Sequence, residues 1–239
     1  MHFTATARHV DRLDPNRSVI AFTSTTIRNY VAGHRRIPPS SDMAIDMSPC
    51  PAATPPERID LGDVLLRRWQ PSDLDRQFAA LTDSHAHLRR WMPWAQEPPT
   101  LDGQRRFLRI CAAHWPTPSG GYLYGIFTAA DEVVGGIGLH DRIEPGAIEI
   151  GYWGHVAHTG RGIITRAARA LTDVALTLPH IARVEIRCDA ENARSAAVPQ
   201  RLGYELVSTA PRPRAAPGDS GIGMVWATMS RPTGWLVEG

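Results

Sequence analysis

Residues 148–153 (IEIGYW) and residues 159–165 (TGRGIIT) decide the fold of this chain, because they read as a strand that leads through a glycine-rich loop into a long helix. The helix begins near Gly162, and Pro179 ends it. Its apolar residues recur at helical spacing on one face, at Ile164, Ala167, Leu171, Val174, Ala175 and Leu178. Two glycines let the backbone approach a ligand closely, and the first turn of a helix offers unpaired amides at the positive end of its dipole. The segment therefore predicts a site for a phosphate or a diphosphate.

Three arginines accompany this loop. Arg161 lies within it, and Arg166 and Arg169 follow in the first turns of the helix. The helix dipole disfavours a cation at that end, so an anion nearby would explain the two helical arginines. A Gly-Arg-Gly triplet is also the composition of an ordinary tight turn, and the triplet alone leaves both interpretations open.

Working outward from this segment, turn signals separate short periodic stretches from Ile59 onward. We expect strands within 62–69, 122–128, 133–139, 147–153, 183–189, 204–208 and 222–229. Besides the long helix, we expect helices opened by residues 72–75, near 85–94, over 100–115 and over 194–202. The three strands between 122 and 153 should form an antiparallel meander. Strands and helices in this order predict an α+β, or mixed α/β, sheet domain.

The pattern divides the chain into three parts. Residues 1–57 show no sustained period and hold several prolines, so we expect a flexible extension rich in Pro, Ser, Thr and Arg, or a start of translation at Met43 or Met47. Residues 58–231 form the folded domain, and residues 232–239 form a C-terminal tail.

Composition narrows the function classes. All 26 basic residues among the 239 are arginines, which weakens any mechanism that needs a lysine, such as a Schiff base or a Walker-type phosphate loop. A net charge of +2 without a basic stripe argues against nucleic-acid binding. Cys50, Cys111 and Cys188 lie far apart and suggest neither a zinc site nor disulfides, and no apolar run is long enough for export or membrane insertion. We therefore expect a cytoplasmic protein.

A second group of polar residues follows the strand at 183–189. Residues 189–195 (DAENARS) precede a short helix, and residues 201–204 (RLGY) end it. Capping alone would account for Asn192 and Ser195. Together with the loop, however, the order and spacing resemble the GNAT superfamily of acyl-CoA-dependent N-acyltransferases, in its RimJ/RimL-type branch. The resemblance covers Ile59 to Met229, and it departs from the family loop at Thr159 and Ile164.

The resemblance implies a mainly antiparallel twisted sheet with helices on both faces, and acetyl-CoA as co-substrate without a metal. It implies that backbone amides hold the CoA diphosphate at Gly160, Arg161, Gly162, Ile163, Ile164 and Thr165. The strand end at Tyr152, Trp153 and Gly154 would pair with the pantetheine arm like an added strand, and Asn192 would hydrogen-bond that arm.

Two side chains are candidates for proton transfer. Glu149 matches the family's glutamate before Ile-Gly-Tyr and would act as a base through a water, although a solvent-facing strand glutamate fits the same pattern. Pro199 stands where many relatives have the tyrosine that protonates the thiolate, so Ser195 is the substitute acid, unless it is a plain helix-start serine. At neutral pH, deprotonation costs about tenfold for an α-amine and about a thousandfold for a lysine side chain, which favours an α-amine acceptor.

The partners follow from this interpretation. They are acetyl-CoA and an amine acceptor, either a protein N-terminus or a small molecule, with no nucleic acid or membrane, in a monomer or homodimer. Trp91 and Trp94 match the place where the branch lines its acceptor pocket, although core packing is the alternative for either one. His155 and His158 lack a third ligand for a metal. A CoA-binding module with weak or no catalysis is the alternative function.

Overall fold

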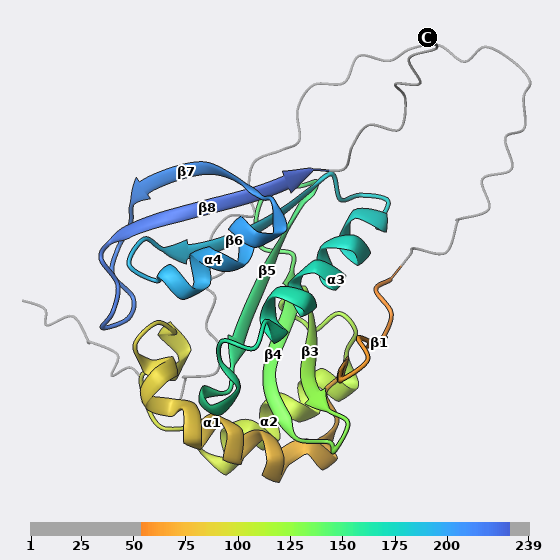
Figure 1. Ribbon diagram of the computed structural model, residues 1–239. Helices are drawn as coiled ribbons and strands as arrows, with labels where there is room; N and C mark the ends of the chain where they lie inside the picture. Colours follow the sequence, from red (N-terminus) through yellow and green to blue (C-terminus); the bar gives the residue numbers. More distant parts are fainter. Residues whose placement is uncertain (1–53, 230–239) are drawn as a thin grey trace, which may run out of the picture. The chain divides into compact units, whose positions relative to one another are not determined.

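One eight-stranded sheet organises the protein. The computed structural model describes residues 54–229 (Figure 1). The sheet has the order β1-β2-β3-β4-β5-β6-β8-β7, and every neighbouring pair is antiparallel except β5 with β6. The strands are β1 (Arg58–Asp60), β2 (Val64–Arg68), β3 (Gly121–Thr128), β4 (Val133–His140), β5 (Ala147–Gly154), β6 (Arg183–Asp189), β7 (Glu205–Pro211) and β8 (Ile222–Met229).

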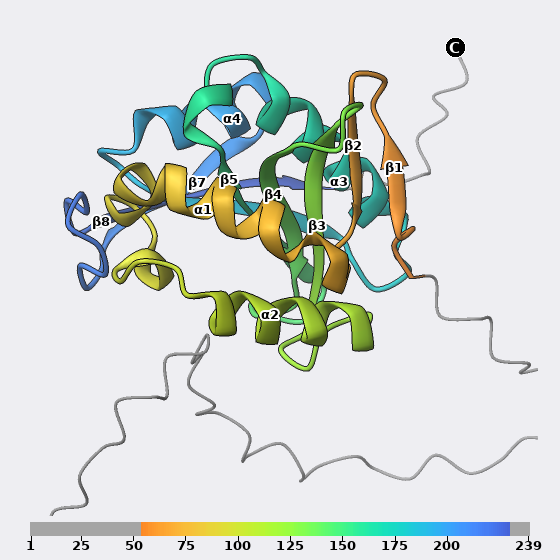
Figure 2. The same ribbon diagram turned by 90° about the horizontal axis from the view of Figure 1, so that it is seen from below.

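Helices cover both faces of this sheet, and Figure 2 shows α4 and α2 on opposite sides of the strands. The α-helices are α1 (Leu74–Arg89), α2 (Leu101–Ala113), α3 (Ile163–Thr177) and α4 (Ala193–Leu202). Three short 3-10 helices complete the order: η1 (Pro71–Asp73), η2 (Pro93–Ala95) and η3 (Val156–His158). The mixed, mainly antiparallel sheet with helices on both faces confirms the predicted fold class.

The core lies in two layers because side chains alternate along each strand. On one face, Ile148 and Ile150 of β5 pack in a cluster with Ala167 and Leu171 of α3. On the other face, Trp153 of β5 packs against the clusters formed with α1 and α2. Even-numbered side chains of β5 therefore point toward α3 and α4, and odd-numbered ones toward α1 and α2.

Most of the expected elements are present within one or two residues of their expected bounds, and the β3-β4-β5 meander is confirmed. The separate helix near 85–94 was wrong. Residues 85–89 are the last turn of α1, since nothing between Leu81 and Arg89 breaks the helix, and Pro93 then starts η2. Strand β1 was missed because three residues are too short to show a period.

The predictions for the two ends of the chain are not tested by the structure. The predicted extension at 1–57 and the predicted tail at 232–239 lie almost entirely outside the described residues, as does Cys50. Within residues 54–229, no helix is both long and apolar enough to cross a membrane.

Candidate active site

The start of α3 is built to receive an anion. Gly162 is the N-cap residue, with a left-handed backbone (φ 72°), and no side chain caps the helix. Gly160 is also left-handed (φ 78°), and a Cβ at either glycine would meet nothing within 4 Å. The first-turn amides of Ile163, Ile164 and Thr165 have no intrahelical partner, and the two glycines before them add no side chain that would block access. This geometry fits a phosphate held by backbone amides.

The arginines near this loop have different partners. Arg166 forms an ion pair with Asp63, with Nη2 at 2.9 Å from Oδ2. That hydrogen bond holds the pKa of Asp63 below its usual value. The sequence had suggested an anion near Arg166, and that anion is the carboxylate of Asp63. Arg166 therefore gives no support for a bound phosphate. Arg161 is exposed in the loop, and Arg169 lies in the second turn of α3.

Strands β5 and β6 separate beside this helix start. Their parallel pairing ends at Glu149 opposite Glu185, whereas β5 continues to Gly154 and stays paired with β4. Figure 1 shows the two strands diverging. Residues 150–154 therefore present a strand edge toward β6 that has no strand partner among the described residues. An extended ligand with amide groups can pair with such an edge.

Tyr152 spans the gap between β5 and α4. Its hydroxyl lies 3.0 Å from the Ser195 carbonyl oxygen and 3.2 Å from Ser195 Oγ. Burial raises the pKa of Tyr152, so the phenol stays protonated and can donate a hydrogen bond. The structure thus places a phenol next to Ser195, which the sequence pattern had not linked.

Asn192 caps α4. Its side chain Oδ1 accepts a hydrogen bond of 3.1 Å from the Ser195 amide. Capping, which the sequence had offered as an alternative, is therefore one role of Asn192. The cap uses the oxygen only, and the Nδ2 donor has no partner among the described residues.

Glu149 lies where the two strands separate, and its charge is compensated. It is 7% exposed, and Arg142 donates to both carboxylate oxygens, from Nε at 2.9 Å and from Nη2 at 2.5 Å. The alternative of a solvent-facing strand glutamate is wrong, because the side chain is buried. Glu149 is odd-numbered and faces the side of α1 and α2, whereas Ser195 lies in the first turn of α4 on the opposite face.

Two neighbours of Glu149 were missed in the sequence. His140 is its cross-strand partner on β4, and Glu185, 2% exposed, is its partner on β6. Burial, followed by the charge of Arg142, lowers the pKa of His140 to about 4, so the imidazole is neutral at pH 7. Gly151 makes room for this ring, since a Cβ there would lie 3.0 Å from His140 Nε2. Only strand register could have revealed this group, because its members come from three strands.

The two tryptophans expected at the acceptor pocket have different environments. Trp91 is half-buried, with the Arg90 guanidinium 5.0 Å from its ring centroid and with the loop between β7 and β8 against it. Trp94 in η2 is 50% exposed. Core packing therefore does not explain Trp94.

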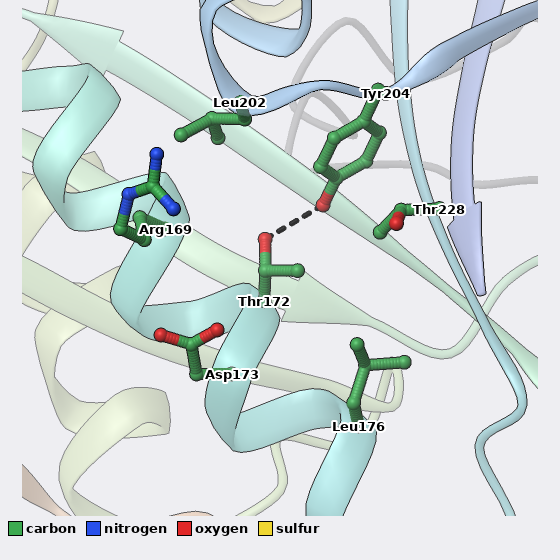
Figure 3. Close-up of a pocket in the computed structure, with 7 residues that line it drawn as sticks. All are labelled: Arg169, Thr172, Asp173, Leu176, Leu202, Tyr204 and Thr228. Carbon is green, nitrogen blue, oxygen red and sulfur yellow. Dashed lines mark hydrogen bonds between the residues drawn. The ribbon is translucent and has the colours of Figure 1, made fainter. Parts of the chain in front are cut away.

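A small cavity of about 160 Å³ lies away from this loop, between α3, the end of α4 and β8 (Figure 3). The Thr172 hydroxyl and the Tyr204 hydroxyl are 2.6 Å apart at its wall, and burial raises the pKa of Tyr204 to about 12. Thr172 lies ten residues beyond Gly162, or about 15 Å along the helix. The hydrogen bond between Thr172 and Tyr204 ties α3 to the segment after α4, and the cavity lies apart from the start of α3.

The two histidines considered for a metal have other partners. His155 Nε2 lies 3.7 Å from Asp83, and His158 Nε2 lies 3.1 Å from Glu132. Across the described part of the chain, no three His, Cys, Asp or Glu side chains gather as a metal site.

Two features of the structure are shared with a known class of enzymes. The two parallel strands of a mixed sheet separate, and beside them an uncapped helix begins after two glycines. Residues 63–205 match the family model of the acetyltransferase (GNAT) domain, which is about three fifths of the chain. The chain belongs to the GNAT acetyltransferase family and is an acyl-CoA-dependent N-acetyltransferase by that membership.

Particular relatives refine this assignment. The putative ribosomal N-acetyltransferase YdaF of Bacillus subtilis (strain 168) is 31% identical over 147 residues, which cover 59% of this chain and 77% of YdaF. The ribosomal-protein-serine acetyltransferase of Escherichia coli (strain K12) is 38% identical over 78 residues, covering 32% of this chain and 43% of that protein.

Solved structures share the fold. The ribosomal L7/L12 α-N-protein acetyltransferase RimL in complex with coenzyme A superposes with a TM-score of 0.65 at 24% identity, covering 72% of this chain and 98% of that one. The acetyltransferase from Salmonella typhimurium that modifies the N-terminal serine of L7/L12 gives a TM-score of 0.62 at 22% identity, covering 73% and 100%.

Proposed function

We propose that this protein transfers acetyl from acetyl-CoA directly to the α-amine of a protein N-terminus. The observation that carries the proposal is the separation of β5 from β6 next to the uncapped start of α3. Two relatives whose names describe ribosomal-protein acetylation, YdaF and the Escherichia coli serine acetyltransferase, support a protein acceptor.

In this proposal the coenzyme is held almost entirely by backbone. The amides from Gly160 to Thr165 bind the diphosphate, with Arg161 adding charge at the loop. The free edge of β5 at Tyr152, Trp153 and Gly154 pairs with the pantetheine amides. The Nδ2 of Asn192 donates to the same arm, while its Oδ1 keeps the helix cap.

The reaction removes two protons from the acceptor nitrogen, delivers one proton to the departing thiolate, and replaces a carbon–sulfur bond with a carbon–nitrogen bond. The incoming ammonium loses a proton, and the neutral nitrogen attacks the thioester carbonyl carbon. The nitrogen of the tetrahedral intermediate then releases its second proton to solvent, and the carbon–sulfur bond breaks as the intermediate collapses. The thiolate takes up a proton from Ser195, whose hydroxyl regains one from solvent. Glu149 receives the amine proton through a water, and Arg142 fixes the position of that carboxylate. Ser195 delivers a proton to the thiolate, with Tyr152 hydrogen-bonded beside it.

The opposite faces of the sheet give this scheme its geometry. Glu149 faces the side of α1 and α2, whereas Ser195 lies in the first turn of α4 on the other side. A thioester lying in the gap between β5 and β6 would meet the amine from the first side and the proton donor from the second. This arrangement suits direct transfer in a ternary complex, without a covalent enzyme intermediate.

The test is Glu149→Gln, assayed by thiol release and by mass spectrometry of a peptide with a free N-terminus. We expect kcat to fall by about a hundredfold or more while the Kd of CoA stays within about twofold, because the base acts only in the chemical step. Unchanged turnover would remove Glu149 from the mechanism. If the wild-type protein binds CoA tightly yet acetylates no amine or peptide of a broad panel, the chain is a CoA-binding module instead.

A further inference from the structure

Three exposed arginines converge at one end of the sheet, and we call them the arginine patch. Arg89 and Arg90 lie at the C-terminal end of α1, and Arg194 lies in the first turn of α4. His87, in the last turn of α1, connects the two groups, since burial and then the charge of Arg194 hold its pKa below the usual value. None of the three arginines forms an ion pair with any residue from 54 to 229, in contrast to Arg142, Arg166 and Arg212.

Helix electrostatics explain only part of the arginine patch. Cations at the end of a helix are favoured by its dipole, which accounts for Arg89 and Arg90. Arg194 is at the wrong end of α4, where the dipole repels a cation, and no acidic residue lies in that first turn. A negatively charged ligand would compensate this arginine.

A formed hollow lies next to the arginine patch. It measures about 390 Å³ and is lined by Ala86, Arg89, Arg90, Pro217 and Gly218. The loop between β7 and β8 is fastened to α1 here, because the Gly218 amide donates to the Arg90 carbonyl oxygen at 2.8 Å. A Cβ at Gly218 would lie 2.6 Å from that oxygen, so the close approach requires glycine. Figure 1 shows this loop beside the end of α1.

The distance from the proposed reaction centre sets which part of an acceptor would reach the patch. The segment after β5 contacts α1 at Ser84, whose Oγ accepts a hydrogen bond from the Val156 amide at 3.0 Å. Ser84 and Arg89 are five residues apart, or about 7.5 Å along the helix. Glu149 lies five residues, or about 16 Å, before Gly154 along β5, and an extended peptide advances about 3.3 Å per residue. A chain whose amine lies beside Glu149 therefore reaches Arg89 within about its first eight residues.

We propose that the acceptor is a peptide chain with acidic residues within about the first eight positions behind its α-amine, bound in the hollow by Arg89 and Arg90. The inference rests on the proposed function, since it takes the amine to lie beside Glu149 of β5. Exposed charge pairs mainly guide association and set specificity, and salt screens them. The preference for an acidic acceptor should therefore appear as a lower KM for that peptide, and it should weaken as ionic strength rises.

The experiment uses the full-length protein and three synthetic peptides with the same first two residues. One carries Asp and Glu at positions 3 to 5, the second carries Asn and Gln there, and the third has the same acids moved beyond position 9. We expect the first peptide to show a KM about tenfold below the other two at low salt, and the difference to shrink at about 0.5 M NaCl.

The variant is Arg89→Glu combined with Arg90→Glu. Its matched control is Arg106→Glu combined with Arg109→Glu, two exposed arginines on α2 that do not line the hollow. We expect the first double variant to lose the preference for the acidic peptide while keeping its KM for acetyl-CoA, and the control to keep both.

Equal KM values for the acidic and neutral peptides with the wild-type protein would overturn the inference. So would a variant that raises the KM for acetyl-CoA instead, because the arginines would then hold the coenzyme. If no peptide is acetylated at all, the proposed function fails rather than this refinement of it.

Discussion

Helices α3 and α4 both begin near the gap between β5 and β6, yet they treat their first-turn amides in opposite ways. At α4, Asn192 closes the helix by accepting a hydrogen bond from the Ser195 amide. At α3, Gly162 has no side chain to offer, and two left-handed glycines leave the amides open. A helix start that is satisfied by its own residues serves structure, and one left unsatisfied at an open surface is suited to an anion. The difference favours α3 over α4 as the diphosphate site of the proposed function, with α4 contributing side chains only.

The largest expected effect comes from closing the open helix start. Gly162→Val forces a β-branched residue into a left-handed conformation, which costs about 1–3 kcal/mol, or distorts the loop. We expect the Kd of CoA to rise about tenfold to a hundredfold by isothermal titration calorimetry.

Gly203→Val is the matched control for this change, because Gly203 is equally left-handed (φ 77°) at the C-cap of α4. It should destabilise the fold by a similar amount while leaving CoA affinity within about twofold once the folded fraction is accounted for. Equal losses of affinity in both variants would mean that general destabilisation, rather than the start of α3, explains the result.

The next effect separates the cap of α4 from its ligand contact. Asn192→Ala removes both the cap and the Nδ2 donor, and should cost about 1 kcal/mol in chemical denaturation. Asn192→Ser keeps a capping oxygen, so its stability should stay within about 0.5 kcal/mol of wild type, while CoA affinity falls about threefold to tenfold. If Asn192→Ser binds CoA as tightly as the wild type, Asn192 is a cap and nothing more.

A smaller effect is expected for the hydroxyl pair that joins β5 to α4. Tyr152→Phe removes the hydrogen bonds to Ser195 and should lower the free energy of unfolding by about 0.5–1.5 kcal/mol. If Tyr152 assists Ser195, kcat falls together with this stability loss, and Ser195→Ala lowers kcat by a similar factor. A variant with normal kcat would leave the phenol as a structural contact only.

The smallest effect on CoA affinity is predicted for Arg166, although its position at the start of α3 would suggest a phosphate contact. Arg166→Gln should change the Kd of CoA by less than about twofold, because Asp63 already neutralises this guanidinium. Arg161→Gln, at an exposed loop arginine with no carboxylate partner among residues 54–229, should weaken CoA binding about threefold to fivefold at low salt. A larger loss of CoA affinity in Arg166→Gln than in Arg161→Gln would show that Arg166 leaves Asp63 when the coenzyme binds.

Local sequence carried much of this picture, and its failures have clear causes. The strand at 147–153, the glycine loop and the helix after it were legible because periodicity and glycine positions are local properties. The helix expected at 85–94 failed because no local signal separated it from the preceding turns. Arg166 was misread because its partner, Asp63, lies 103 residues away in sequence.

The sequence by itself determined the fold class, the family resemblance and the loop that offers free amides, since each depends on residues that are neighbours along the chain. Only the tertiary structure decided what surrounds Glu149. Strand register brings His140, Glu149 and Glu185 together from three strands, and Arg142 reaches into the same group. It also decided that Glu149 and Ser195 lie on opposite faces of the sheet, and that the end of α1 meets the loop between β7 and β8. Such groupings arise from long-range strand pairing and helix packing, which the spacing of residues along the chain does not encode.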